Sequence, residues 1–351
     1  MKMKTLVVVI PAYNEEATVG KVVREIPRDI PGVDRVLVLV FDDGSTDRTA
    51  DAARAAGADF VLAHERNRGL AATFRDALDA ALALGADVIV NTDADNHYDQ
   101  TRIPELAAPI LSGSADVVVG SRALNGLRKM SFVRKWGNRI GNSLLVLLYR
   151  LPKGTDVSSG FRAYSREAAL RLTLTSNYTY AHESLIVARD HNLAIENRVF
   201  PARDVTRPSR LMSSVGSHIF RAGSVAILSY AVHRLFNILI GLSAVLTLAG
   251  AAAFLRFLYY FSTSGGTGHV QSLVIGSALL VVGMQVLVGS FFGLALAKNR
   301  RLIEEIIYQQ RRALYEPKLA MPAHVDVPSS VAGMADTVSS GQRAKVALAE
   351  K

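Results

Sequence analysis

The sequence predicts an α/β fold in which a mostly parallel β-sheet carries helices on both faces, followed by a C-terminal hairpin of two transmembrane helices. Two observations predict the sheet: short β-branched runs alternate with helical segments as far as about residue 200, and polar clusters follow several of these runs. Two long uncharged stretches beyond residue 234 predict the hairpin.

The expected strands are short, and alanine-rich amphipathic segments such as 49–56 and 70–84 separate them. Continuous apolar runs joined by helices are typical of a parallel sheet that is buried on both faces. The strand-like runs are residues 5–10, 35–41, 59–63, 86–91 and 115–120. They place an α/β domain at residues 1–209.

Polar clusters follow four of these strands, at the point where each strand ends. They read PAYNEE from Pro11, DDGSTD from Asp42, TDADNH from Thr92 and GSR up to Arg122. Open α/β sheets bind their ligands at the carboxyl ends of the strands. The four clusters therefore predict one site at this edge of the sheet.

The cluster after the fourth strand has the character of a metal site. Asp93 and Asp95 point the same way if the segment is extended, because side chains alternate along a strand. Two such carboxylates can hold Mg²⁺ or Mn²⁺ with help from substrate phosphates, although such pairs are also common in turns and caps. His97 is either a third ligand, which suits Mn²⁺ better, or a loop histidine bonded to backbone. With Asp99, three acids lie so close together that they repel each other unless a positive group lies among them.

Composition excludes several classes of protein. The chain has 351 residues, a net charge of +9 and no cysteine, so disulfides and thiolate metal sites are ruled out. A net positive charge favours binding to phosphates, nucleic acid or an anionic membrane surface, and charge alone does not distinguish among these partners. Neither a G-x-G-x-x-G nor a P-loop motif occurs, and no nucleic-acid-binding motif is present. We therefore expect no nucleic-acid partner.

The C-terminal stretches are long enough to cross a bilayer. Residues 235–255 and 270–297 carry no charged side chain, and about 20 helical residues span the roughly 30 Å of hydrocarbon. Basic residues flank both outer ends, which predicts that both ends face the cytosol and that the turn faces outward. The flanking residues are His233, Arg234, Lys298, Arg300 and Arg301. A pair of buried helices in a soluble protein is the alternative.

These features divide the chain into four parts. A cytosolic domain at 1–209 is followed by juxtamembrane amphipathic helices at 210–234, for which a surface helix of the soluble domain is the alternative. The transmembrane hairpin occupies 235–297, and residues 298–351 form a basic cytosolic helix and a tail expected to be disordered. The prediction is a multi-pass protein of the cytoplasmic (inner) membrane, and the sequence leaves open whether it forms a homo-oligomer.

Five segments, taken together and in order, resemble a known family. VVVIPAYNEE, FDDGSTDRT, TDADNH, GSR and DVSSGFRAYSREA are similar to family 2 glycosyltransferases of the GT-A fold, which is Rossmann-like. More closely, they resemble the dolichyl- and polyprenyl-phosphate sugar synthases, membrane enzymes that load one sugar onto a lipid phosphate. The resemblance covers roughly residues 5–300, and the last segment with the hairpin is more specific than DDGSTD.

The resemblance implies a role for each matching residue on the donor side. Pro11, Tyr13, Asn14 and Glu15 match the loop that holds the nucleoside, and Asp42 and Asp43 match the acids beside the base. Asp93 and Asp95 match the metal-binding pair on the diphosphate, with glutamine usual in the family where this chain has His97. Arg207 and Arg210 lie in TRPSR, which resembles a basic loop that closes on the donor and usually ends in lysine.

On the acceptor side, the resemblance implies that Arg122, Arg134 and Asn138 hold the acceptor phosphate. Asp156 either binds sugar hydroxyls or holds its own loop. The residues that the resemblance places nearest the reaction are Asp95, Arg122, Arg134 and Asp156.

The activity implied is inverting, metal-dependent transfer of one sugar from a GDP- or UDP-linked donor to a polyprenyl phosphate of the dolichyl, undecaprenyl or decaprenyl type. A phosphomonoester is largely ionised at neutral pH, since its second pKa is about 6, so no general base is required. Two alternatives remain: a membrane-anchored transferase for a soluble or polysaccharide acceptor, and a scaffold with a catalytically inactive transferase fold. The sugar, the base and the lipid length are open.

Overall fold

The computed structural model describes residues 3–122, 143, 145–147, 149–174, 180–201, 203, 215–265 and 270–315, with backbone only for 215–235 and 264. The chain forms two compact units, Met1–Arg311 and Arg312–Lys351. The description below concerns the first unit. Of the second, the described residues 312–315 are helical.

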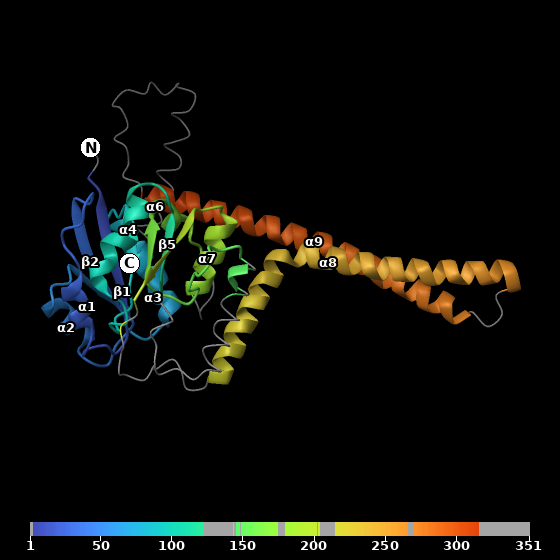
Figure 1. Cartoon of the computed structure of the whole chain (residues 1–351), viewed down its shortest axis with the longest axis horizontal. Coiled ribbons are helices and arrows are strands. Elements are labelled where there is room, and N and C mark those ends of the chain that lie inside the picture. Colours follow the sequence, from blue (N-terminus) through green and yellow to red (C-terminus); the bar gives the residue numbers. More distant parts are fainter. Residues whose placement is uncertain are drawn as a thin grey trace, which may run out of the picture. The chain divides into compact units, whose positions relative to one another are not determined.

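A seven-stranded sheet forms the centre of the described fold (Figure 1), with the strand order β3-β2-β1-β4-β6-β5-β7. The strands are β1 (Thr5–Ala12), β2 (Arg35–Asp42), β3 (Phe60–Ala63), β4 (Val88–Asn91), β5 (Val117–Arg122), β6 (Arg162–Ser165) and β7 (Ile195–Phe200). The five strands expected from sequence are all present. The prediction of a mostly parallel sheet is confirmed, since β6 alone runs antiparallel to its neighbours among these strands.

The antiparallel direction of β6 decides where the site lies. Arg162, its first residue, pairs with Asn91 near the carboxyl end of β4 and with Val119 near that of β5. The loop that leads into β6 therefore reaches the same edge of the sheet at which β4 and β5 finish. Residues 156–161 come to lie beside the segments that follow those two strands.

Helices cover both faces of the sheet. α1 (Val19–Glu25) and α4 (Ile103–Leu111) share a hydrophobic core with the even-numbered residues of β1, and α3 (Leu70–Ala83) contacts β1 and β2 from the other side. The remaining described helices of the domain are α2 (Thr49–Ala55), η1 (Gln100–Arg102), α6 (Arg166–Arg171) and α7 (Tyr180–Asp190). The buried residues of β1 alternate between the two cores, as expected for a strand with both faces covered.

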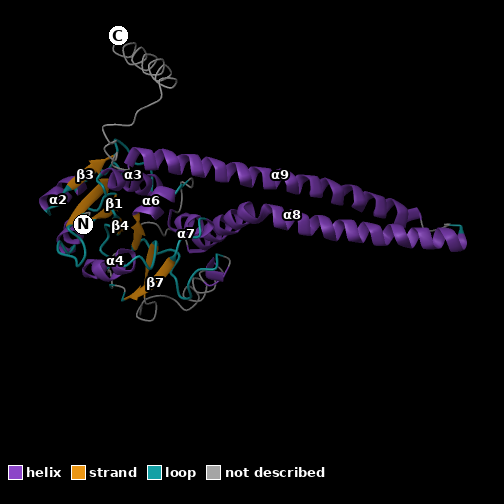
Figure 2. Cartoon of the chain, turned by 90° about the horizontal axis from the view of Figure 1, so that it is seen from above, coloured by secondary structure: helices purple, strands orange, loops and turns teal. Residues whose placement is uncertain are grey.

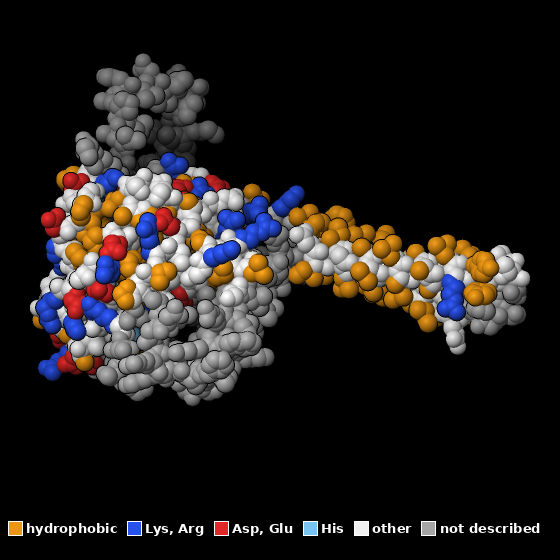
Figure 3. Space-filling model, viewed as in Figure 1, with side chains coloured by type: hydrophobic (Ala, Val, Ile, Leu, Met, Phe, Trp, Pro, Cys, Tyr) orange, Lys and Arg blue, Asp and Glu red, His pale blue; other side chains and the backbone are white. Residues whose placement is uncertain are grey.

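Two long helices follow, α8 (Val215–Ser264) and α9 (Val270–Tyr315). Phe236–Thr263 and Val270–Tyr315 are long and apolar enough to cross a membrane, and only 11% and 17% of their most apolar windows are buried in the protein. On the face that Figure 3 shows, hydrophobic side chains are distributed along most of the length of this pair. Core helices of a soluble protein would hide that surface, so the two helices indicate membrane association.

Small residues allow α8 and α9 to pack closely. A side chain on Gly250 would place its Cβ 2.9 Å from the backbone nitrogen of Leu280, and one on Gly283 would place it 2.6 Å from Thr247 Oγ1. Ser243 Oγ donates to the Gly283 carbonyl at 2.9 Å. Close helix contact through glycine and a serine hydrogen bond is typical of helix pairs in lipid.

The C-terminal part of α9 lies against α3 and α6 (Figure 2). Tyr308 donates to Glu167 at 3.1 Å, and the guanidinium of Arg171 lies 4.0 Å from the centre of the Tyr308 ring. Arg311 donates to the Leu172 carbonyl just beyond α6 at 2.9 Å and pairs with Asp79 of α3. These contacts attach the hairpin to the face of the domain opposite the α1 and α4 core.

Candidate active site

Three segments meet at the carboxyl edge of the sheet: the loop after β4, the end of β5 and the loop before β6. Gly160 shows how closely they approach. A Cβ at Gly160 would lie 2.6 Å from Asp93 Oδ1 and 2.9 Å from the Tyr180 hydroxyl. The Asp93 carboxylate therefore occupies space that only a glycine leaves open.

Asp93 lies in an electrostatically unfavourable place. Burial raises the pKa of Asp93, the neighbouring Asp95 charge raises it further, and Arg122, His97 and Arg162 only partly oppose them, so that the pKa reaches about 7. A divalent cation would supply the missing positive charge, and two carboxylates are the oxygen donors that Mg²⁺ and Mn²⁺ accept. The residues present thus fit such a cation.

Replacing Asp93 with asparagine is expected to stabilise the metal-free protein at neutral pH. The pKa rises from 3.8 to about 7 on folding, so the charged form weakens the fold, and the penalty grows as pH rises through this window. Asp93→Asn removes the charge with little change of shape. We expect its melting temperature in EDTA to exceed that of the wild type by about 2 °C or more at about pH 8, with the gain fading toward about pH 4. A lower melting temperature at the higher pH would contradict this view of Asp93.

His97 contacts Asp95 through its side chain. The ring atom Nδ1 is hydrogen-bonded to the Asp95 carboxylate, and the His97 backbone N–H donates to Asp95 Oδ1 at 3.1 Å. The hydrogen bond with Asp95 is the main reason why the pKa of His97 is raised. Among the described residues, no three His, Asp or Glu side chains could hold a metal ion by themselves. A cation bound here would need oxygen atoms from its ligand as well.

Asp99 has partners of its own. Its carboxylate accepts from the backbone and hydroxyl of Thr101 at 3.2 and 2.7 Å, and from Arg203 at 2.9 Å. Burial alone would raise the pKa of Asp99, but the bonds to Thr101 and the charges of Arg203 and Arg102 lower it. Asp99 therefore helps to hold the structure of the loop.

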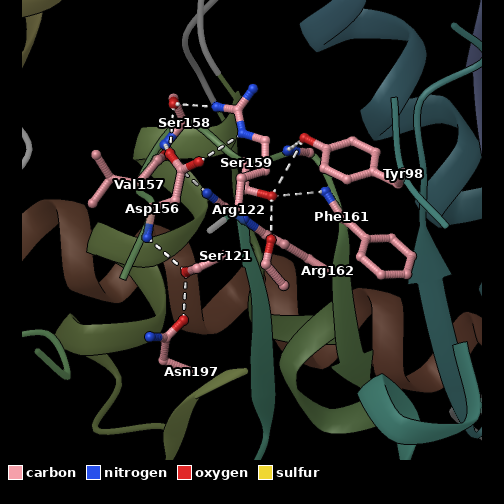
Figure 4. Close-up of polar contacts among 12 residues, drawn as sticks. Tyr98, Ser121, Arg122, Asp156, Val157, Ser158, Ser159, Phe161, Arg162 and Asn197 are labelled. Atoms are coloured by element: carbon pink, nitrogen blue, oxygen red, sulfur yellow. Dashed lines mark hydrogen bonds and ion pairs between the residues drawn. The ribbon is translucent and has the colours of Figure 1, made fainter. Parts of the chain in front are cut away.

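Arg122 and Asp156 form an ion pair across the two other segments (Figure 4). Arg122 Nε donates to Asp156 Oδ2 at 2.8 Å, and Nη2 donates to Ser158 Oγ at 3.2 Å. Ser158 also donates to Asp156 from its backbone and hydroxyl, at 3.1 and 2.7 Å. Burial would raise the pKa of Asp156, yet the Arg122 charge and these hydrogen bonds lower it. Of the two roles expected for Asp156, the structure shows contacts that hold its own loop.

The residues that the sequence predicts for the donor side form a network between the first two loops. Asn14, which has a left-handed backbone (φ 54°), donates to Ser45 Oγ at 2.8 Å, and its side chain accepts from the Thr46 backbone at 2.8 Å. The Glu15 backbone donates to Thr49 Oγ1 at 2.8 Å. Pro11 is buried in β1, whereas 43% of Tyr13 is exposed.

Asp42 and Asp43 are both buried and bonded. Asp42 accepts from the Ser45 backbone at 3.1 Å. Asp43 accepts from the backbones of Arg68 and Gly69, each at 2.8 Å, and lies 2.8 Å from Nδ1 of His64. Asp43 thus joins the second loop to the start of α3.

Other predicted residues lie outside the described part of the chain. These are Arg134, Asn138, Arg207 and Arg210.

Sequence reasoning missed several residues that shape the site. The Tyr98 hydroxyl accepts from the Gly160 backbone at 3.0 Å, and its ring stacks on Phe161 with centroids 5.2 Å apart. Arg162 is fully buried and donates to Ser184 and to the Val157 carbonyl at 2.7 and 2.9 Å. Tyr98 lies 62 positions from Gly160 and Ser184 lies 22 positions from Arg162, so no local pattern connects them.

Comparisons with known proteins agree with this fold. The family model for glycosyl transferase family 2 matches residues 7–173. The UDP-N-acetylglucosamine–dolichyl-phosphate N-acetylglucosaminyltransferase of Methanococcus voltae is 29% identical, over 56% of this chain and 84% of the relative. The dolichyl-phosphate hexose transferase of Haloferax volcanii is 32% identical, over 54% of this chain and 79% of the relative. The crystal structure of glucosyl-3-phosphoglycerate synthase from Mycobacterium tuberculosis with Mn²⁺, UDP and phosphoglyceric acid matches with a TM-score of 0.51 and 27% identity, over 65% of this chain and 78% of that chain.

The sheet, the acidic edge and these likenesses define a glycosyltransferase with a GT-A-like fold, so the protein is an enzyme. The chain belongs to glycosyl transferase family 2.

The close approach of Gly160 and Asp93 leads to a prediction about sugar transfer. A Cβ in Gly160→Ala would meet the Asp93 carboxylate at 2.6 Å, so the carboxylate must move. A misplacement of about 1 Å in a reacting assembly costs roughly 100-fold in rate, and we expect a loss of that order. Gly20→Ala in α1 is the control, because its Cβ would meet neighbours only at 3.5 Å or more. Wild-type turnover by Gly160→Ala would show that Asp93 need not occupy this position.

Proposed function

We propose that the enzyme transfers one sugar from a nucleotide-diphosphate sugar to a polyprenyl phosphate. The observation that carries this proposal is the Asp93–Asp95 pair just after β4, where both acids are partly buried and Asp93 has too little positive charge around it. A pair of acids in that condition suits a cation shared with a diphosphate. The similar crystal structure of the Mycobacterium tuberculosis synthase contains Mn²⁺ and UDP, which supports the same donor chemistry.

Two observations support a lipid phosphate as the acceptor: the names of the relatives and the apolar hairpin. Two relatives are named as transferases that use dolichyl phosphate. Two helices with exposed apolar surfaces are attached to the domain through Tyr308 and Arg311, which suits an acceptor that resides in a membrane. We propose that Arg122, with Arg134 and Asn138, holds the acceptor phosphate.

In the proposed reaction, an ionised phosphate oxygen of the acceptor attacks C1 of the sugar. The bond from C1 to the donor diphosphate breaks, and the nucleoside diphosphate leaves with that electron pair, which inverts the configuration at C1. Mn²⁺ or Mg²⁺ held by Asp93 and Asp95, with His97 beside Asp95, would neutralise the charge of the diphosphate. Asp156 holds Arg122 in place, so the Arg122 guanidinium can orient the acceptor phosphate without giving up a proton to its nucleophilic oxygen.

The donor side is assigned in the same way. We propose that Pro11, Tyr13, Asn14 and Glu15 line the nucleoside site and that Arg207 and Arg210 close over the diphosphate. Asp42 and Asp43, the acids proposed to lie beside the base, are both buried; Asp42 is bonded to its own loop and Asp43 to the start of α3.

The proposal is tested with membranes that contain the enzyme. They are incubated with polyprenyl phosphate and a panel of radiolabelled GDP- and UDP-sugars, and then extracted with organic solvent. We expect one donor to give label in the organic phase, and chelation by EDTA to prevent it. If no donor labels the lipid although a soluble acceptor is glycosylated, the lipid acceptor is wrong.

One observation favours a second acceptor class. The similar crystal structure contains phosphoglyceric acid, a soluble phosphorylated compound. A soluble phosphomonoester would present the same ionised oxygen to Arg122. Including phosphoglyceric acid in the assay separates this acceptor from a lipid.

The chain's topology is also part of the proposal: domain 1–209 and segment 298–351 in the cytosol, hairpin 235–297 across the cytoplasmic membrane, and 210–234 at its surface. The chain has no cysteine, so Ser264→Cys, at the end of α8, introduces one thiol. We expect an impermeant maleimide to label it on intact cells, because basic flanks keep the outer helix ends inside. Ser45→Cys in the domain is the control and should react only after lysis. The opposite pattern would reverse the orientation.

A further inference from the structure

Arg203 contacts the loop that carries the two acids at three different residues. Its Nη1 donates to Asn96 Oδ1 at 2.9 Å, and its Nη2 donates to Asp99 Oδ1 at 2.9 Å. Its backbone N–H donates to the His97 carbonyl at 3.3 Å. The same guanidinium forms an ion pair with Glu25, the last residue of α1. One residue thus joins the acidic loop to a helix of the core.

The loop needs such support because of its backbone. Asn96 lies between Asp95 and His97 and has a left-handed conformation (φ 61°), which non-glycine residues rarely adopt. This residue turns the chain, so its conformation sets the directions of the side chains before and after it. Arg203 bonds to the Asn96 side chain and to the carbonyl of the next residue, and therefore acts on both sides of the turn.

The positive charge of Arg203 also pairs with two acids, one on α1 and one on the loop. Glu25 and Asp99 both face its guanidinium, and about three quarters of each acidic side chain is buried. Without Arg203, the two acids would keep only longer ion pairs among the described residues, Glu25 with Lys21 at 3.9 Å and Asp99 with Arg102 at 3.8 Å. The ion pairs that join α1 to the loop through Arg203 would be lost.

We propose that Arg203 is a positioning residue that fixes the loop 95–99 in the form in which Asp93 and Asp95 bind the divalent cation. This inference rests on the proposed function, because it takes those two acids as the cation's ligands. Arg203 itself touches neither the cation nor the sugar. It comes shortly after Phe200, the last residue of β7, so it also ties the acidic loop to the end of that strand.

The test is Mn²⁺ affinity, measured on the full chain in detergent by the electron paramagnetic resonance of free Mn²⁺. UDP or GDP is present, whichever one stabilises the wild type. Loss of a residue that supports metal ligands typically weakens binding about 10- to 100-fold, and we expect a loss of this order for Arg203→Ala. Arg203→Lys should recover part of it, because lysine brings one charge but no fork for several acceptors. Arg198→Ala is the control, since Arg198 lies on β7 and pairs only with Glu196 among the described residues.

A double-mutant cycle with Glu25 separates positioning from general stability. Glu25→Gln removes the anchor on α1 and should weaken Mn²⁺ binding by itself, but it should add little in the Arg203→Ala background. Mn²⁺ affinity within about twofold of wild type in Arg203→Ala, whatever its melting temperature, overturns the proposal. If that variant does not fold, unchanged affinity in Glu25→Gln overturns it instead.

Failure of the proposed function looks different. Wild-type Mn²⁺ affinity in Asp95→Asn would contradict the metal site itself, and the role of Arg203 with it. Weak binding by Asp95→Asn together with normal binding by Arg203→Ala would contradict the role of Arg203 alone.

Discussion

Asp95→Asn is expected to lower the rate of sugar transfer by about 1,000-fold while the protein remains folded. A metal ion contributes several kcal/mol of charge stabilisation in such a transition state, and roughly 1.4 kcal/mol corresponds to a factor of ten in rate. Asparagine keeps the shape of the side chain but loses the charge that holds a cation. The measurement is initial rate with saturating donor, acceptor and Mn²⁺, together with the melting temperature.

Asp51→Asn is the matched control, because Asp51 is an exposed acid that pairs with Arg54 on the surface of α2. It should transfer sugar at the wild-type rate. Both the wild type and Asp51→Asn should lose activity in EDTA and regain it with Mn²⁺ or Mg²⁺. Full transfer by Asp95→Asn in the presence of EDTA would rule out a role for the metal.

Arg122→Ala is expected to impair use of the acceptor much more than binding of the donor. Loss of a hydrogen bond to a charged group costs about 1.5–3 kcal/mol, which is roughly a 10- to 100-fold loss of kcat/KM for polyprenyl phosphate. The affinity for the nucleoside diphosphate, measured by calorimetry, should change less than about threefold by comparison. The reason is that Arg122 ends β5 and bonds to Asp156, whereas the Asn14 and Asp43 network follows β1 and β2, which β6 and β4 separate from β5.

Asp156→Asn shows whether Arg122 acts directly. This variant keeps the Arg122 charge but weakens the bond that orients it, so we expect a smaller loss of kcat/KM for the acceptor than in Arg122→Ala. If Asp156→Asn is as impaired as Arg122→Ala and nucleotide binding falls equally in both, then Arg122 only supports its own loop.

The fold could be predicted where a strand is a continuous apolar run. β1, β2 and β4 have that pattern, and the expected ranges differ from the observed bounds by at most two residues. β6 was missed because its four residues begin with the buried charge of Arg162, which no apolar pattern reveals. β7 was missed because most of its residues are only partly buried or exposed at the edge of the sheet.

The part of the site that could be predicted is the set of residues that lie at the ends of strands. Asp93 and Arg122 follow strands, so strand ends were enough to bring them to one edge. Asp99 was expected only to add to the repulsion among three nearby acids, and its ion pair with Arg203 could not be foreseen because the two residues lie 104 positions apart. The same holds for Asp43 and His64, which meet because β2 and β3 are neighbours in the sheet. Local patterns carry no information about such pairs.

The central claim is that an ionised lipid phosphate accepts the sugar. The most direct measurement compares initial rates for polyprenyl phosphate and for the free polyprenol of the same length, with the purified enzyme, Mn²⁺ and the preferred donor. Transfer to the phosphate alone is the predicted result, because the alcohol has no ionised oxygen and the proposed site supplies no base to create one. Equal transfer to the free polyprenol would contradict the account.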